Sequence, residues 1–279
     1  MAMVFSEFFA DAPAARAGDG PFYVSLGDSL SVGYQPGRGE TRKGYVDDLW
    51  RRVRETIPGL ETRKFGCPGE TSRSMITGNN SPCEYTAGSQ LDAAVAFLGR
   101  HGGEVPFITI DIGVNDIVNR CLDFRTGLLD KTCVMELRPR LEDRLTRIVG
   151  DLSGAAGPDV PILGMTYYDP FLGFWGLVPH GHLLARKSER SFEVFNAAET
   201  AAYGSAGAVV ADVAETFRID DFSHTVVLHG RGRVPVNVAL TCRWSWFCSQ
   251  KYFGDPHANA IGYRKIARTF HRELKPLLP

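Results

Sequence analysis

Four short polar segments of this sequence carry residue types that acyl-transfer chemistry needs. Ser29 follows one apolar run that is typical of a strand, Gly66 follows a second, and Asn115 follows a third. His257 lies just before the last helical pattern of the chain. Because ligands bind beyond the carboxyl ends of parallel strands, we expect these four segments to meet at one edge of a sheet.

Each of these residue types has a distinct task in cleaving an ester. A serine hydroxyl is a poor nucleophile until a base takes its proton, and a histidine suits that task when a third group orients its ring. The tetrahedral oxyanion needs fixed donors, which the N–H groups of Ser29 and Gly66 and the side-chain amide of Asn115 could supply. We place Ser29 at the start of a helix, where it would also be a favourable N-cap.

The elements that must position these residues follow from the hydrophobic pattern. Short apolar runs predict strands at residues 22–26, 60–65, 105–113, 160–168 and 208–213. Amphipathic stretches between and after them predict helices at residues 45–57, 91–98, 137–152, 186–203 and 258–274. This alternation predicts an α/β fold with a central parallel sheet of about five strands and helices on both faces. Two regions, 169–185 and 217–254, break the pattern and are interpreted as functional loops.

The domain organisation is predicted to be simple. Residues 21–279 contain no evident repeat or linker, so we assign them to one domain. Residues 1–20 have no basic start and no long apolar run, so they do not form an intact signal peptide. We interpret them as a flexible arm, a propeptide remnant or a cloning scar.

Composition limits the classes of partner. The chain has 279 residues, of which 44% are hydrophobic and 23% charged, which is typical of a soluble globular protein. Its net charge of −1 argues against a nucleic-acid partner. No apolar run is long enough for a membrane span. We expect a monomer that uses no metal and no cofactor.

The same four segments resemble the four blocks of the SGNH (GDSL) hydrolase superfamily. The matching stretches are "GDSLS" at 27–31, the glycine of "FGCPGETSRSM" at 66, "GVND" at 113–116 and "DPHANAIGY" at 255–263. Their order and spacing match from about residue 22 to about residue 270. The resemblance implies a flavodoxin-like three-layer α/β/α sandwich and a ping-pong ester hydrolysis without a metal.

The segment around His257 departs from the pattern of many members. They place the orienting aspartate three residues before the histidine, where this chain has Gly254. Asp255, two residues before His257, is our candidate for that role, and a backbone carbonyl near 253–255 is the alternative. The usual His-Pro-Asn is His-Ala-Asn here, which removes no catalytic group.

The six cysteines favour an exported protein. They form no CxxC pair, so a zinc ribbon is not expected. Their even number and local spacing suit the disulfides Cys67–Cys83, Cys121–Cys133 and Cys242–Cys248, one of fifteen connectivities. The alternative is six reduced cysteines in a cytosolic protein. The three local pairs also resemble those of secreted actinobacterial lipases and esterases of this superfamily, which implies an extracellular location.

The two interrupting regions are rich in aromatic residues. Phe174, Trp175, Trp244 and Trp246 either cover the core or wall an apolar acyl pocket, and we name them as candidate substrate contacts. We therefore expect a serine esterase or lipase that acts on small-molecule or lipid esters. The alternatives are a carbohydrate O-acetyl esterase and a non-catalytic binding protein on the same fold. A nucleotide binder would need a phosphate loop, and "GDSLSVG" lacks the lysine of that loop.

Overall fold

A central parallel sheet organises the molecule. The computed structural model describes residues 20–278, so the predicted arm at 1–20 lies almost wholly outside the described residues. Five parallel strands form the sheet in the order β2-β1-β3-β6-β7. They are β1 (Phe22–Gly27), β2 (Glu61–Lys64), β3 (Phe107–Asp111), β6 (Ile162–Met165) and β7 (Val209–Ala211). The predicted α/β fold with a five-stranded parallel sheet is confirmed, and the strand order is that of flavodoxin-like folds.

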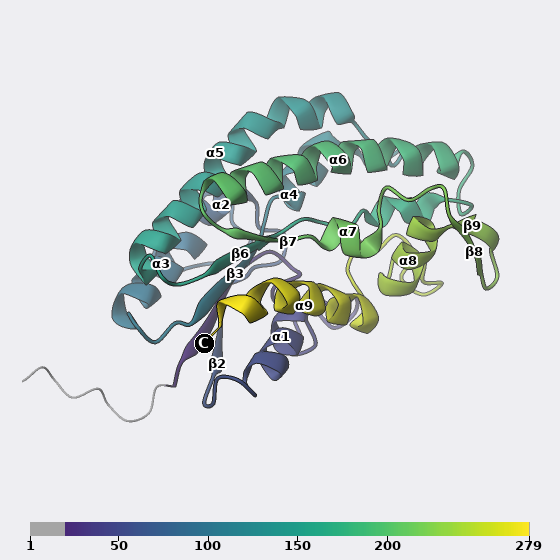
Figure 1. Ribbon diagram of the computed structural model, residues 1–279. Coiled ribbons are helices and arrows are strands. Elements are labelled where there is room, and N and C mark those ends of the chain that lie inside the picture. Colours follow the sequence, from purple (N-terminus) through teal and green to yellow (C-terminus); the bar gives the residue numbers. More distant parts are fainter. Residues whose placement is uncertain (1–19, 279) are drawn as a thin grey trace, which may run out of the picture.

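Helices cover both faces of this sheet. On one face lie α1 (Tyr45–Val53) and α9 (Ala260–Leu274), below the sheet in Figure 1. On the other face lie α3 (Gln90–Arg100), α5 (Lys131–Ala156) and α6 (Gly181–Ser205). The shorter helices are α2 (Ser72–Thr77), α4 (Val114–Cys121), α7 (Val213–Phe217), α8 (Val236–Trp244), η1 (Pro170–Phe174) and η2 (Lys275–Leu277). Two small hairpins pair β4 (Leu122–Asp123) with β5 (Leu128–Leu129) and β8 (Thr225–Leu228) with β9 (Gly232–Pro235).

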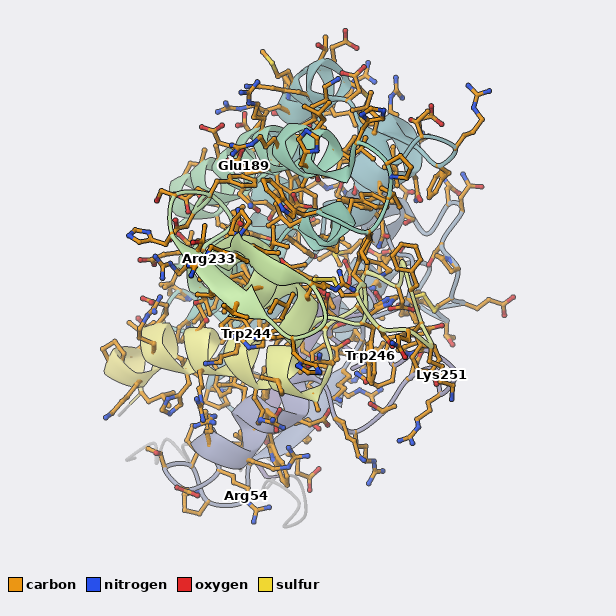
Figure 2. All side chains as sticks on the ribbon, turned by 90° about the vertical axis from the view of Figure 1, so that its right-hand side faces the viewer. Arg54, Glu189, Arg233, Trp244, Trp246 and Lys251 are labelled. Atoms are coloured by element: carbon orange, nitrogen blue, oxygen red, sulfur yellow. A yellow bond between two sulfur atoms is a disulfide. The ribbon has the colours of Figure 1, made fainter. Side chains whose placement is uncertain are left out.

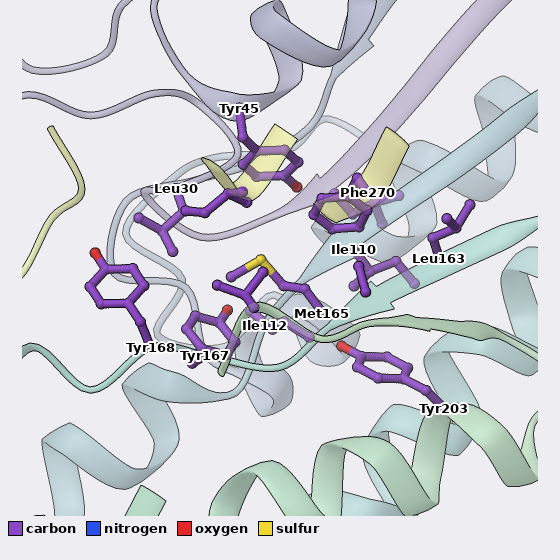
Figure 3. Packing of buried hydrophobic residues seen from close by; sticks show 14 of the residues in the cluster. Leu30, Tyr45, Ile110, Ile112, Leu163, Met165, Tyr167, Tyr168, Tyr203 and Phe270 are labelled. Atoms are coloured by element: carbon purple, nitrogen blue, oxygen red, sulfur yellow. The ribbon is translucent and has the colours of Figure 1, made fainter. Parts of the chain in front are cut away.

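Burial explains which runs became central strands. Every residue of β1 and of β3 is buried, as expected of apolar strands that have helices on both faces. The edge strand β2 is mostly exposed and reads Glu-Thr-Arg-Lys, a charged composition that discourages pairing with another sheet. In the core, Tyr167, Tyr168 and Leu30 gather at the same end of the packed side chains (Figure 3). The large side chains at that end support the segments that follow β1 and β6.

Helix α9 is anchored at the end that carries the histidine segment. The Asn259 side chain accepts hydrogen bonds from the amides of Ile261 and Gly262, which caps the first turn. Near the other end of α9, the Phe270 ring stacks on Tyr45 of α1, with 4.9 Å between ring centroids. The start of α9 is therefore fixed, and with it the residues just before Asn259.

Three sequence predictions about local structure need correction. Ser29 does not start a helix: residues 29–33 form turns, and the next helix begins at Tyr45. The reason is that Gly33 adopts a left-handed conformation, and the Tyr34 amide that comes after it donates back to the Ser29 carbonyl at 2.9 Å. Helix α1 ends at Val53 rather than near residue 57. The region 217–254 is not an irregular loop, since it contains the β8–β9 hairpin and α8.

Candidate active site

Hydrogen bonds to Gln90 and Asp111 hold the backbone of the segment that carries Ser29. At the end of β1, the Gln90 side chain accepts from the Gly27 amide at 2.7 Å and donates to the Gly27 carbonyl at 3.1 Å. The Asp28 amide donates to the Asp111 carbonyl of the neighbouring strand β3 at 3.0 Å. Gln90 and Asp111 are fully buried, so Ser29 follows a backbone that has little freedom to move. Gln90 was not predicted from the sequence, where it is one polar residue of a helix.

The segment that carries His257 is tied to two other parts of the chain. The Trp246 amide donates to the His257 carbonyl at 2.9 Å. The Tyr168 hydroxyl donates to the Pro256 carbonyl at 2.6 Å. The His257 amide in turn donates to Asp255 Oδ1 at 3.0 Å. These contacts fix the backbone on both sides of the imidazole.

Ser29, His257 and Asp255 form a continuous chain of polar contacts. Ser29 Oγ lies 2.9 Å from His257 Nε2, and His257 Nδ1 lies 2.9 Å from Asp255 Oδ1. The side chains of His257 and Asp255 are 18% and 21% exposed, so the pair is accessible but largely shielded from water. The arrangement can take a proton from the serine hydroxyl and hold the imidazole in one orientation.

A cavity of about 380 Å³ opens beside this chain of contacts. Ser29, His257, Asn115 and Gly69 all line it. The rest of its wall is mainly apolar or aromatic, formed by Leu30, Tyr34, Pro68, Val114, Val118, Tyr167, Tyr168, Pro170, Phe171 and Pro256, with Asp28 beside Ser29. Such a wall, with a few polar groups at one place, is typical of a site for a small apolar ligand.

Three potential donors for an oxyanion face this cavity or border it. Asn115 lies in the first turn of α4, and its Nδ2 donates one hydrogen bond to the Glu70 carbonyl at 2.9 Å. An amide NH₂ has two donors, so the second remains available. Within the described range, the main-chain amides of Ser29 and Gly69 donate no hydrogen bond to protein. The three groups can stabilise developing negative charge next to Ser29.

The structure does not support Gly66 as one of these donors. Gly66 is absent from the cavity wall, and its α-carbon packs against the Ser31 side chain instead. A Cβ at this position would lie 1.8 Å from Ser31 Oγ, so glycine is required here for close packing. Gly69 occupies the cavity wall in its place, in a tight turn that the Glu70 amide closes on the Cys67 carbonyl. The dipeptide Pro68-Gly69, with φ of +86° at the glycine, is the sequence signal for that turn.

The four aromatic residues predicted as substrate contacts do not line the cavity. Phe174 packs edge-on against Phe247, and Trp175 lies next to Phe222. Trp244 packs on Phe217 and under the Lys265 ammonium of α9, and the Trp246 indole donates to Gln35 Oε1 at 3.0 Å. Figure 2 shows Trp244 beside α9, and Trp246 near Lys251. None of these four rings lies on the cavity wall, whose aromatic part is formed by Tyr34, Tyr167, Tyr168 and Phe171.

Two buried carboxyl groups lie behind Ser29. Burial raises the pKa of Asp28, although hydrogen bonds from the Leu30 amide and the Tyr167 hydroxyl oppose that shift. Burial, and then the adjacent Asp28 charge, raise the pKa of Asp111 well above its usual value. The Tyr45 hydroxyl donates to Asp111 Oδ1 at 2.6 Å. None of these hydrogen bonds reaches the imidazole, and Asp28 Oδ1 lies 3.4 Å from Ser29 Oγ.

The six cysteines form three local disulfides, each next to a segment of the site. Cys67–Cys83 closes the loop that contains Gly69, and Cys121–Cys133 joins the end of α4 to α5. Cys242–Cys248 closes the turn whose Ser245 bridges to Ala258, next to His257. Crosslinks of this kind restrict the unfolded chain and hold the loops that they close.

Two further features bear on the classes of function considered above. In residues 20–278, no cluster of three or more histidine, cysteine or acidic side chains has the arrangement of a metal site. None of the helices that the structure describes is both long and apolar enough to cross a bilayer.

Comparison with solved structures supports the fold. Phospholipase A1 from Streptomyces albidoflavus NA297 matches with a TM-score of 0.54 and 16% identity, covering 91% of this chain and 99% of the other. The extracellular lipase from Streptomyces rimosus matches with a TM-score of 0.55 and 17% identity, covering 91% and 99%. An acetyl xylan esterase, AlAXEase, matches with a TM-score of 0.52 and 12% identity, covering 90% and 98%. At these identities the similarity shows the fold alone.

Comparison at the level of sequence identifies the family. No curated protein sequence matches this chain. The family model of the GDSL-like lipases and acylhydrolases matches residues 25–265, which include all four predicted segments. Because this match spans most of the 279 residues, the chain belongs to the GDSL-like lipase/acylhydrolase family.

Proposed function

We propose that this protein is a serine hydrolase of carboxylic esters, with Ser29 as nucleophile, His257 as general base and Asp255 as the group that orients His257. The observation that carries the proposal is the pair of 2.9 Å contacts that joins Ser29 Oγ, His257 and Asp255 at the wall of an apolar cavity. Membership of an acylhydrolase family supports the same class of reaction.

Acylation is the first half of the proposed reaction. Ser29 Oγ attacks the ester carbonyl carbon while its proton passes to His257 Nε2. The carbonyl oxygen becomes an oxyanion, which accepts hydrogen bonds from the Ser29 and Gly69 amides and from Asn115. The bond from carbon to the alcohol oxygen then breaks, and the leaving alcohol takes the proton from Nε2. An acyl group remains on Ser29 Oγ.

Deacylation repeats these steps with water. A water molecule attacks the acyl carbon and gives a proton to His257 Nε2, which forms a second tetrahedral intermediate. The bond from carbon to Ser29 Oγ breaks, and Oγ takes the proton from Nε2. The carboxylic acid leaves, and the resting state is restored. Throughout, Asp255 accepts the hydrogen bond from Nδ1 and so keeps Nε2 directed at Ser29.

The cavity supports an acyl group as the part of the substrate that is bound. Val114, Val118, Pro170 and Phe171 give it an apolar wall close to Ser29. Apolar contacts of this kind favour a hydrocarbon chain over a sugar, whose hydroxyl groups would lose hydrogen bonds to water there. We therefore favour aliphatic acyl esters as substrates.

Export from the cytosol is part of the proposal. The structure joins all six cysteines in disulfides, which persist in oxidising compartments and are rare in the cytosol.

A series of p-nitrophenyl esters from acetate to decanoate tests the proposed function. We expect hydrolysis by the wild-type protein and loss of nearly all activity in Ser29→Ala, by about a thousandfold or more. Ser31→Ala is the matched control, because Ser31 lies in the same turn but does not line the cavity. It should lose only about tenfold or less, the effect of one hydrogen bond.

The same series distinguishes the proposal from its alternatives. A maximum at medium chain length supports an acyl-chain esterase, whereas hydrolysis confined to acetate would favour an O-acetyl esterase. Wild-type rates in Ser29→Ala, or no hydrolysis of any ester by the wild-type protein, would refute the proposal.

A further inference from the structure

A tyrosine ring covers one face of the imidazole of His257. The ring centroids of Tyr34 and His257 are 4.4 Å apart, and the ring planes are inclined by 36°. The edge of the imidazole is already used by Ser29 at Nε2 and by Asp255 at Nδ1. Tyr34 is thus the aromatic neighbour that meets the face of the ring rather than its nitrogen atoms.

The position of Tyr34 is set by its main chain. Its amide donates to the Ser29 carbonyl at 2.9 Å, and its carbonyl accepts from the Tyr263 hydroxyl of α9 at 2.9 Å. Between residues 20 and 278, every hydrogen bond of Tyr34 uses these main-chain atoms. The hydroxyl group of Tyr34 therefore makes no hydrogen bond that the fold requires, and the contact of the side chain with His257 is made by the aromatic ring.

The next residue joins the same two segments. Gln35 Nε2 donates to the Ala258 carbonyl at 3.3 Å, and Gln35 Oε1 accepts from the Trp246 indole at 3.0 Å. Gln35 is buried, so these bonds are protected from water. Residues 34–35 therefore connect the turn after Ser29 to the two segments beside His257, at Trp246 and at Ala258.

The charge of His257 changes during the proposed reaction, and this gives the Tyr34 ring a role. When Ser29 attacks, the imidazole gains a proton and a positive charge. An aromatic face attracts a cation within about 6 Å of its centroid. Tyr34 meets this condition, and its own backbone is fixed to Ser29.

We propose that Tyr34 is a positioning residue for ester hydrolysis. Its ring holds the imidazole of His257 in the orientation that directs Nε2 at Ser29 Oγ, and it attracts the positive charge of the imidazole in the transition state. This inference rests on the proposed function. It predicts that the aromatic face is required and that the hydroxyl group is not.

Two variants separate the face from the hydroxyl group. Tyr34→Phe keeps the ring, and Tyr34→Leu keeps apolar bulk in the cavity wall but removes the aromatic face. We expect kcat to fall about two- to thirtyfold in Tyr34→Leu, the range of one cation–π contact, and to stay within about twofold of wild type in Tyr34→Phe. Because Tyr34 also lines the cavity, both variants are measured with p-nitrophenyl acetate and octanoate.

The pattern across substrates decides the role. An equal loss of kcat for both esters in Tyr34→Leu, with rescue in Tyr34→Phe and unchanged melting temperatures, supports the inference. A loss confined to octanoate or to KM would show that Tyr34 is only a wall of the acyl site and would overturn it. Wild-type kcat in Tyr34→Leu would overturn it as well.

Ser29→Ala, measured in the same assay, separates this inference from the function on which it rests. If Ser29→Ala is inactive while Tyr34→Leu is fully active, only the role of Tyr34 fails. If Ser29→Ala is fully active, the proposed function fails and the inference fails with it.

Discussion

Each member of the proposed Ser29–His257 pair has an aspartate close before it in the chain, and the two aspartates differ in environment. Asp28 is fully buried and accepts from the Leu30 amide at 2.9 Å and from the Tyr167 hydroxyl at 3.0 Å. Asp255 is 21% exposed at its side chain and accepts from the ring and the amide of His257. Ser29 Oγ lies 3.4 Å from Asp28 Oδ1 but 2.9 Å from His257 Nε2.

The role of each carboxylate therefore follows from its contacts and not from its sequence proximity to a reacting residue. Asp28 is adjacent to the proposed nucleophile, yet its hydrogen bonds hold the turn to the core. Asp255 lies on the accessible side and contacts the proposed base directly. We expect substitutions near Asp28 to change stability and substitutions of Asp255 to change rate.

The largest expected effect is on the rate of Asp255→Asn. An asparagine keeps the size of the side chain but can no longer accept from Nδ1–H as a charged group, and it favours the wrong tautomer of His257. We expect kcat to fall by about a thousandfold or more, with a change in melting temperature of only a few degrees. Steady-state hydrolysis of p-nitrophenyl esters and thermal unfolding measure the two quantities. A loss of less than about tenfold would mean that a backbone carbonyl orients His257.

Asp169, a further buried acid, makes the stability of the protein depend on pH. Asp169 is fully buried and caps η1, and burial raises its pKa to about 8. Since the pKa in the folded state is raised, the stability that the protonated carboxyl contributes is present below about pH 4 and is lost as the pH rises to about 8. An asparagine stays neutral and can still accept from the Phe171 amide and from Ser188.

Asp169→Asn should therefore flatten the dependence of stability on pH. We expect the free energy of unfolding of the variant, relative to wild type, to rise by a few kcal/mol between about pH 5 and about pH 9. Urea unfolding at both pH values measures it. Parallel pH profiles for the two proteins would show that Asp169 does not titrate in this range.

The smallest expected effect concerns the hydrogen bond behind Ser29. Tyr167→Phe leaves one oxygen of the buried Asp28 carboxyl without its donor, which should cost about 1–3 kcal/mol of unfolding free energy. Because this contact does not reach the imidazole, we expect kcat to change by less than about tenfold. Chemical denaturation and ester hydrolysis give the two numbers. A large loss of rate without a loss of stability would contradict the structural role of Asp28.

The central sheet could be predicted from the sequence, and most residues of the proposed site could be named from it, because both leave local signals. Buried strands appear as apolar runs, and Ser29, Asn115 and His257 stand where such runs or a helix meet a polar segment. Asp255 was predicted with an alternative, and its 2.9 Å contact with His257 favours it.

The sequence predictions that differ from the structure concern residues whose position depends on packing between distant segments. Gly66 and Gly69 are three residues apart, and only the contact of Gly66 with Ser31 shows which of them leaves the cavity. Trp175 and Trp244 are apolar and lie in loops, but whether a ring faces a ligand or another ring depends on its tertiary neighbours. The tilted ring contact of Tyr34 with His257 joins residues that are far apart in the chain.

Covalent trapping of the nucleophile would identify the reacting serine itself. Diethyl p-nitrophenyl phosphate phosphorylates an activated serine and releases one p-nitrophenolate per active site. We predict one adduct per molecule, mapped by peptide mass spectrometry to Ser29, and no adduct in Ser29→Ala or His257→Ala. An adduct on another residue, or equal labelling of His257→Ala, would contradict the assignment of Ser29 and His257 as the reacting pair.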